Sequence, residues 1–222
     1  MTQSDDKPTL DNVIRFPVEA VTRFGFQRAE KRGSSSRTVK MESEGQMTLF
    51  EGRESHPQKG KVVPLPLQLS PFEEALMLDD QGDERAEEIY TKAIENGDRV
   101  ADAWCNLGVL RSIEGDLDSA FDCFAQSLAA GPRHAESHYN IANLYFEIGD
   151  LRVARTHYEI ALDVNEEFVN AWFNYGLVTA LAEDYRAAHD ALLRYKQLAP
   201  GAESECIADE LLGYIQTAIH LS

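Results

Sequence analysis

The strongest constraint on the fold of this chain is a repeat with a period of 34 residues in its second part. An alanine recurs at this interval, at Ala86, Ala120, Ala154 and Ala188. Two further columns follow four and seven residues after it: Tyr90, Phe124, Tyr158 and Leu192, then Ala93, Ser127, Ala161 and Tyr195. Because positions i, i+4 and i+7 share one face of an α-helix, the columns predict one helix in every period.

A second helix is predicted upstream of each alanine. Its pattern is a large ring, then an apolar residue three positions later, then a small residue: Trp104, Leu107 and Gly108; His138, Ile141 and Ala142; Trp172, Tyr175 and Gly176. Gly115-Asp116 and Gly149-Asp150 separate the two patterns, where glycine suits a left-handed helix end and aspartate caps the next helix. Proline ends two of the units, at Pro132 and Pro200, where a helix cannot continue.

The pattern W-x-x-L-G, followed by A-x-x-x-F and a terminal proline, resembles the tetratricopeptide repeat. Residues 101–134 match it best, and residues 135–168 and 169–202 match with His138 replacing tryptophan and Tyr195 replacing a small residue. A divergent first unit covers residues 67–100, and its opening helix fits after a one-residue slip. The resemblance implies an all-α, right-handed solenoid of about four helical hairpins over residues 67–202. Residues 203–222 read as a capping helix, which open repeat arrays need.

Residues 1–66 lack this periodicity, and residues 33–66 are rich in Ser, Gly, Pro, Lys and Glu. We therefore expect residues 1–66 to be a mostly disordered tail. Charge divides the chain in the same way. Residues 1–64 hold 11 Lys and Arg against 9 Asp and Glu, so of the chain's 21 and 38 such residues, residues 65–222 hold 10 and 29. A repeat region with a net charge of −19 repels nucleic acid and favours a basic or apolar peptide.

The tail contains one basic stretch, made of Arg23, Arg28, Lys31, Arg32, Arg37 and Lys40, with Phe24 and Phe26 nearby. Three interpretations are open. The stretch could be solvated, could contact nucleic acid, or could fold back on the acidic repeats as an internal competitor for their groove.

In tetratricopeptide arrays the first helix of each unit lines a concave groove, and the resemblance implies the binding positions. The sixth position is Asn106, Asn140 and Asn174, whose amides could bond successive peptide groups of an extended chain. This row resembles the asparagine ladder of the O-linked N-acetylglucosamine transferases, although asparagine is also common at this place in the repeat. Neighbouring predicted groove residues are Tyr139, Phe173, Val109, Asn143 and Leu177. These positions hold no Lys or Arg, so the carboxylate clamp of chaperone-binding repeats is not expected.

Two resemblances in the tail support an alternative function. Gln46, Met47, Leu49 and Phe50 resemble the pentapeptide by which bacterial replication and repair proteins bind the DNA sliding clamp. The segments GQMTLFEG, VVPLP and PFEEAL resemble the rear part of certain bacterial MerR-type regulators that carry such repeats. Apolar periodicity before Gly45 is too sparse for their DNA-binding domain. The alternative is therefore an accessory factor of replication, repair or transcription.

No motif predicts catalysis, because a glycine-rich phosphate loop, a nucleophile elbow and HExxH are all missing from the sequence. His134 and His138 lie four residues apart, but the first falls in a turn and the second replaces a packing tryptophan, so neither a metal nor a cofactor is expected. Cys105, Cys123 and Cys206 have no CxxC spacing and read as reduced thiols. With no signal peptide or membrane span, we expect a bacterial, cytoplasmic scaffold or adaptor that is not an enzyme.

Overall fold

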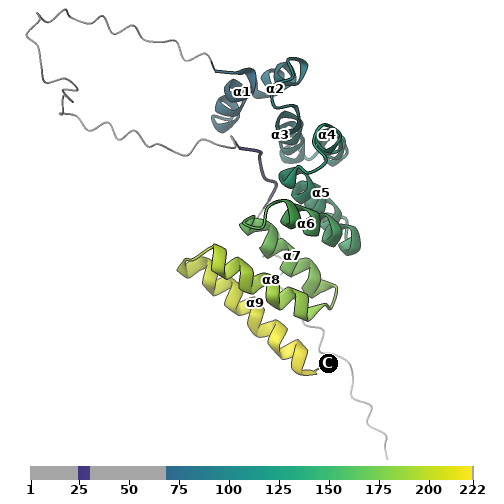
Figure 1. Ribbon diagram of the computed structural model, residues 1–222, viewed down its shortest axis with the longest axis vertical. Helices are drawn as coiled ribbons and strands as arrows, with labels where there is room; N and C mark the ends of the chain where they lie inside the picture. The colour runs from purple at the N-terminus through teal and green to yellow at the C-terminus, as the bar shows by residue number, and fades with distance from the viewer. Residues whose placement is uncertain (1–24, 31–68, 222) are drawn as a thin grey trace, which may run out of the picture.

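The computed structural model describes residues 25–30 and 69–221 (Figure 1). Within these ranges it contains nine α-helices and no strands. Their bounds are α1 Pro71–Asp80, α2 Ala86–Glu95, α3 Val100–Ile113, α4 Leu117–Ala130, α5 Ala135–Glu147, α6 Leu151–Val164, α7 Val169–Leu181, α8 Tyr185–Leu198 and α9 Ala202–Leu221. None of these helices is both long enough and apolar enough to span a membrane.

The helices stack as successive hairpins into an elongated solenoid (Figure 1). Each odd-numbered helix from α1 to α7 packs against the helix that follows it, and α9 packs against α8 at the end of the stack. The predicted helical solenoid is confirmed.

Three aspartates start the second helices of the later hairpins. Asp116, Asp150 and Asp184 each accept a hydrogen bond from the backbone N–H three residues ahead, which caps α4, α6 and α8. The residue before the first two is a glycine with positive φ, 81° at Gly115 and 84° at Gly149. The Gly-Asp turns therefore act as predicted. In the last hairpin Glu183 takes this left-handed conformation with φ 62°, which is unfavourable for a residue with a side chain.

The small residue of each first helix lets a large residue of the second approach closely. Gly108 lies under the ring of Phe124, and a Cβ atom built on Gly108 would lie 2.5 Å from that ring. The corresponding pair in the last hairpin is Gly176 and Leu192, at 3.0 Å. The alanine column is equally tight, with every member at most 2% exposed. Close packing of large on small residues therefore holds each hairpin together.

We predict that Gly108→Ala lowers the free energy of unfolding by about 1–3 kcal/mol, because the new methyl group must displace the buried Phe124 ring. Gly213 is the matched control, since it is a helical glycine in α9 with open space around it. Gly213→Ala should raise the free energy of unfolding by about 0.5–1 kcal/mol. Urea unfolding followed by circular dichroism measures both. Equal effects at the two positions would show that the ring contact is not close.

Two histidines meet between α5 and α6. His138 Nδ1 lies 3.1 Å from His157 Nδ1, and His138 Nε2 lies 3.1 Å from the carbonyl oxygen of Pro132. His138 Nε2 donates to that carbonyl, so its Nδ1 accepts from His157 when both rings are neutral. Burial lowers the pKa of both histidines, that of His157 to about 4 with a further contribution from His138. His134, the other histidine considered for a metal, instead caps α5 and bonds Asp102.

This pair predicts a pH-dependent stability. The unfolded chain binds more protons than the folded chain between the ordinary histidine pKa and the lowered value, so the free energy of unfolding falls as pH drops through that window. His157→Gln should remove on the order of 1 kcal/mol of the loss between pH 7 and pH 5. Urea titrations at both pH values test this, with His220→Gln at an exposed position as the control. An unchanged pH dependence in His157→Gln would contradict the assignment.

Candidate functional site

Residues 25–30 form an extended segment that lies against α1, α3 and α5, the first helices of the first three hairpins. The segment is the short purple trace beside α3 and α5 in Figure 1. Its start contacts α5, where Tyr139 Oη donates to the carbonyl oxygen of Gly25 at 3.3 Å. Its end contacts the turn before α3, where Arg99 Nη2 donates to the carbonyl oxygen of Glu30 at 2.8 Å. The segment therefore runs in the opposite direction to the order of the repeats.

Two asparagines of the predicted row bind the backbone of this segment. Asn140 accepts from the Gln27 N–H at 2.7 Å and donates to the Gln27 carbonyl at 2.8 Å. Asn106 repeats the arrangement on Ala29, with distances of 2.7 and 3.2 Å. The Cys105 thiol also lies 3.8 Å from the Gln27 carbonyl. Each amide thus satisfies the donor and the acceptor of one residue, and successive repeats bind residues two apart.

Apolar contacts flank the two asparagines. The Phe26 ring stacks on Phe124, with ring centroids 6.1 Å apart and planes 20° apart. Ala29 is 1% exposed and belongs to a buried cluster with Cys105 and Val109, to which Ile141 and Leu144 also contribute. The part of the groove that contacts Ala29 is therefore apolar and holds a small side chain.

The Arg28 side chain binds a buried carboxylate of α1. Its Nε lies 2.5 Å from Asp79 Oδ2 and its Nη2 lies 2.6 Å from Asp79 Oδ1, and the Asp79 side chain is 2% exposed. Tyr90 donates to Asp79 Oδ2 at 3.0 Å and accepts from Asn106 Nδ2 at 3.0 Å. Burial, with the Asp79 charge, raises the pKa of Tyr90, so it remains a hydroxyl group. One network therefore joins Arg28 to the asparagine that binds Ala29.

Arg99 closes the other end of the segment. Besides the Glu30 carbonyl, it binds Asp102 Oδ2 through Nε at 2.7 Å, and its guanidinium lies 4.5 Å from the centroid of the Phe72 ring. Asp102 Oδ1 lies 2.9 Å from His134 Nε2. Burial acts to raise the pKa of Asp102, but its hydrogen bonds with His134 and Arg99 outweigh burial and lower it. Arg99 is held in place by this carboxylate.

The remaining predicted groove residues lie in two places. Asn174 Nδ2 donates to Tyr139 Oη at 2.9 Å and to Asn143 Oδ1 at 3.1 Å, and Asn143 also accepts from Tyr158. These amides form a polar layer beside the start of the segment. Phe173 and Leu177 lie near the end of the solenoid, and their contact with a ligand stays a prediction. Both are buried in a cluster with residues of α9, because that helix covers the end of the solenoid.

Sequence reasoning missed Asp79, Tyr90 and Arg99 as site residues. A signal for Asp79 was present, since Phe72, Ala75 and Asp79 share one helix face and a carboxylate among apolar residues is costly without a partner. The one-residue slip in the first unit obscured it. Arg99 lies in the turn before α3, outside the helical positions from which the groove was predicted.

The tail motif of Gln46, Met47, Leu49 and Phe50 lies outside the described residues. The same holds for residues 1–24 and 31–66 of the tail that was expected to be mostly disordered, and for GQMTLFEG and VVPLP, which resemble MerR-type regulators. Residues 25–30 of that tail instead form the extended segment against the solenoid.

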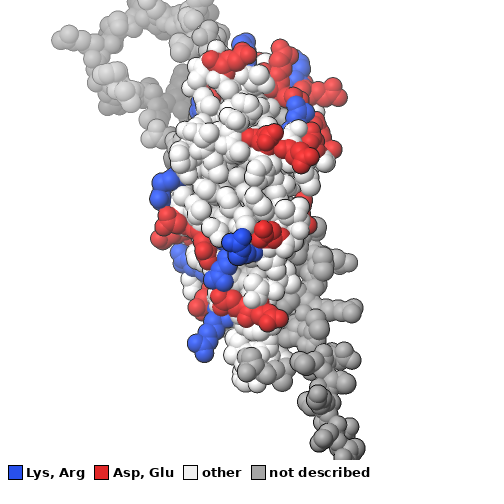
Figure 2. All heavy atoms as spheres, turned by 90° about the vertical axis from the view of Figure 1, so that its right-hand side faces the viewer, with Lys and Arg blue, Asp and Glu red and all other residues white. Residues whose placement is uncertain are grey.

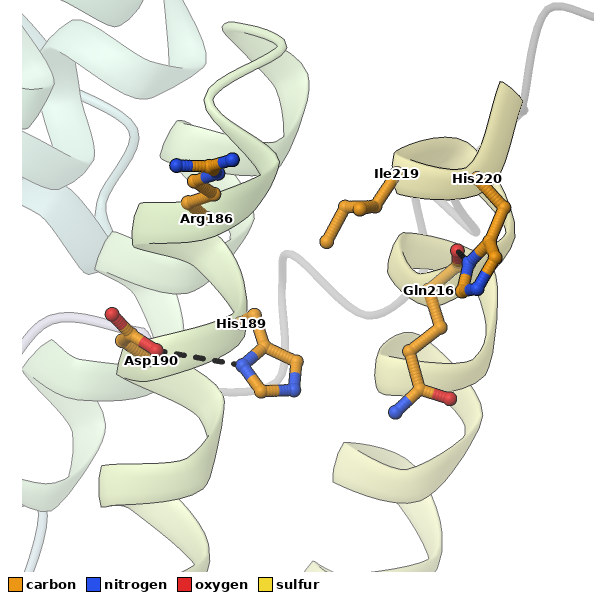
Figure 3. Close-up of a pocket in the computed structure, with 6 residues that line it drawn as sticks. All are labelled: Arg186, His189, Asp190, Gln216, Ile219 and His220. Carbon is orange, nitrogen blue, oxygen red and sulfur yellow. Dashed lines mark hydrogen bonds and ion pairs between the residues drawn. The ribbon is translucent and has the colours of Figure 1, made fainter. Parts of the chain in front are cut away.

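A second hollow, of about 240 Å³, lies between α8 and α9 (Figure 3). Its six lining residues are Arg186, His189, Asp190, Gln216, Ile219 and His220. His189 Nδ1 lies 3.4 Å from Asp190 Oδ1 on the same helix, and His220 Nδ1 is 2.6 Å from the Gln216 carbonyl oxygen. In the described part of the chain, no three His, Cys, Asp or Glu residues are grouped to hold a metal. The groove with two backbone-binding asparagines is the stronger candidate site.

The rate at which the Cys105 thiol is labelled can show whether residues 25–30 occupy the groove, because Cys105 packs in one cluster with Ala29. Burial raises the pKa of its thiol to about 12, so the thiol is both shielded and protonated. We predict that Arg28→Glu, which places a second carboxylate against Asp79, releases the segment and speeds labelling of Cys105 by at least about tenfold. The measurement uses a thiol reagent on full-length chains that carry Cys123→Ser and Cys206→Ser.

The control is Arg85→Glu, because Arg85 is exposed and pairs with Asp83 outside the groove. Equal labelling rates in Arg28→Glu and Arg85→Glu would show that the segment does not protect the thiol.

Comparison with known proteins supports the repeat assignment. Residues 99–167 and residues 139–203 each match a family model for the tetratricopeptide repeat. The chain is 30% identical over 97 residues to tetratricopeptide repeat protein 8 of Mus musculus, which covers 44% of this chain and 19% of that protein. The human counterpart is 29% identical, with 18% of its length covered. The chain thus spans about a fifth of the length of these curated relatives.

Solved structures with the same fold share little sequence. A tetratricopeptide repeat protein from Parabacteroides merdae has a TM-score of 0.55 at 21% identity, covering 66% of this chain and 59% of that one. YrrB, described as having an unusual peptide-binding site, has a TM-score of 0.52 at 20% identity, with 67% and 84% covered. The first repeat domain of Spaghetti (RPAP3), bound to an HSP90 peptide, has a TM-score of 0.50 at 22% identity, with 54% and 93% covered. These matches show the fold and do not show the predicted kinship with MerR-type regulators.

Proposed function

Since residues 99–203 are tetratricopeptide repeats in a helical solenoid, we propose that this chain is a non-catalytic interaction protein. Its groove along α1, α3 and α5 binds an extended segment of a partner protein. One observation carries the proposal: Asn106 and Asn140 each bind the N–H and the C=O of one residue in an extended backbone.

The burial of these amides explains why a peptide is the favoured ligand. Asn106 and Asn140 are both 0% exposed with residues 25–30 in place, so any occupant of the groove buries them. A buried amide without partners costs about 1–3 kcal/mol, so the groove favours a ligand that offers a donor and an acceptor at the right interval. Every residue except proline offers both groups in an extended conformation. The ladder therefore supplies affinity that does not depend on the ligand's side chains.

The charge of the solenoid favours a basic or apolar partner over an acidic one. The first turns of α1 and α2 carry Glu73 and Glu74, then Glu87 and Glu88. Figure 2 draws the right-hand side of the view in Figure 1, away from residues 25–30, and there too Asp and Glu side chains crowd the upper end, where the first helices lie. This surface attracts basic segments and repels phosphate backbones. A role in DNA metabolism is not advanced, because the clamp-like motif that suggested it lies outside the described residues.

Peptide binding is also named for two of the structures with this fold. YrrB is described by its peptide-binding site, and the Spaghetti domain was solved with an HSP90 peptide. The fold of this chain is thus one that holds peptides in other proteins.

Selection from a displayed library of random peptides tests the proposal. Full-length Arg28→Glu is the bait, since its own segment is expected to leave the groove. Selected peptides should bind about 10- to 100-fold more weakly when Asn106→Ala and Asn140→Ala are added, because four hydrogen bonds to the backbone are lost. Asn96→Ala, at an exposed asparagine in the turn after α2, is the matched control and should leave affinity unchanged.

The circular dichroism spectrum and melting temperature show whether the double variant is folded. If a folded double variant kept full affinity for the selected peptides, they would bind elsewhere and the groove would not be the site.

A further inference from the structure

We propose that residues 25–30 compete internally for the groove, and that the partner which displaces them carries a defined side-chain pattern. That pattern is an aromatic residue, any residue, arginine and a small residue. The inference rests on the proposed function and goes beyond it, because it names the class of peptide and the state of the groove without partner.

The arginine requirement follows from the surroundings of Asp79. This carboxylate is 2% exposed, and its two oxygens receive the two parallel N–H groups of Arg28 at 2.5 and 2.6 Å. A lysine presents one compact ammonium group and cannot bind both oxygens in this planar arrangement. With a neutral side chain in place of Arg28, the Tyr90 hydroxyl is the one described hydrogen-bond partner that the Asp79 carboxylate keeps. The groove therefore discriminates among peptides at this position.

The asparagines fix where the arginine must stand. They bind the backbone of Gln27 and Ala29, so the residue between these two is held opposite Asp79. A peptide that slips by one residue presents a different side chain to the carboxylate. The hydrogen bonds from Asn106 and Asn140 do not depend on the peptide's sequence, but they fix which of its residues faces Asp79.

Two neighbouring positions complete the pattern. The position of Ala29 is 1% exposed against Cys105 and Val109, so it accepts only a small side chain. The position of Phe26 lies on the Phe124 ring, which favours an aromatic side chain. Gln27 differs, since the one side-chain hydrogen bond described for it is an exposed contact of 3.4 Å with the Gly25 carbonyl oxygen. Gln27 is only partly buried, so the pattern sets no requirement at this position.

The segment has an advantage over free peptides because it is tethered. Residues 31–68, 38 residues, connect it to the solenoid at Leu69. Linking two binding elements in one chain gives effective concentrations that reach about the millimolar range when the linker is short and suits the span, and that fall as it lengthens. A free peptide with the same side chains must overcome this concentration. The full chain should therefore bind such a peptide weakly until its own segment is disabled.

The experiment measures binding of a fluorescent peptide with the sequence of residues 23–32, RFGFQRAEKR, to full-length proteins. Arg28→Glu should bind it at least about tenfold more tightly than the unaltered chain. Ala29→Trp, which cannot fit its buried position, is a second way to open the groove and should have the same effect. Replacing the peptide's central arginine by lysine or alanine should weaken binding to either variant at least about tenfold.

Asp79→Asn, added to Ala29→Trp, should abolish the preference for arginine, whereas Asp80→Asn at the adjacent exposed carboxylate should keep it. Size-exclusion chromatography should find the unaltered chain to be a monomer.

Three results would overturn the inference. Equal affinity of the unaltered chain and both opened variants would mean that the segment does not compete. Tight binding that ignores the arginine but needs Asn106 and Asn140 would leave the groove function standing and remove its specificity. A dimer that Arg28→Glu dissociates would place the segment in the groove of a second copy, against a competitor within one chain.

Discussion

The site depends on two asparagine amides that are buried when the groove is occupied and that then need hydrogen-bond partners. Asn106 and Asn140 are 0% exposed beneath residues 25–30, and each amide binds the N–H and the C=O of one residue of that segment. A residue in extended conformation presents its N–H and C=O on one side, and the next such pair lies two residues further on. Two amides on successive repeats therefore match a strand and do not match a helix. This match determines the conformation and the direction of anything that binds beside them.

The first hairpin, although most divergent in sequence, adds the selective element. Asp79 on α1 and Tyr90 on α2 connect to Asn106 on α3 through hydrogen bonds of 3.0 Å. Because Tyr90 bonds both Asp79 and Asn106, the position of the carboxylate is coupled to the position of the ladder. A shift of α1 against α3 disturbs both.

Much of the fold could be predicted because it depends on local periodicity. The alanine column, the Gly-Asp turns and the row of asparagines each recur at fixed positions, so the pattern of one unit predicts the structure of the next. The occupant of the groove could not be predicted in the same way. Residues 25–30 have no periodicity, and their structure comes from contacts with residues far away in sequence, such as Asn140. The burial of Phe173 and Leu177 in one cluster with α9 could not be predicted either, because no single repeat specifies how α9 packs.

A tethered segment in the groove affects selectivity more than affinity. Any peptide gains the same backbone bonds to the asparagines, so these bonds cancel when a peptide replaces residues 25–30. What remains is the difference in side-chain contacts, at Asp79 and against Phe124, together with the advantage of the tether. A peptide without arginine leaves the Asp79 carboxylate without an ion-pair partner. Such a peptide would bind an empty groove but would not displace residues 25–30. Under this arrangement a peptide occupies the groove only if its side-chain contacts stabilise the complex at least as much as those of residues 25–30 together with the tether.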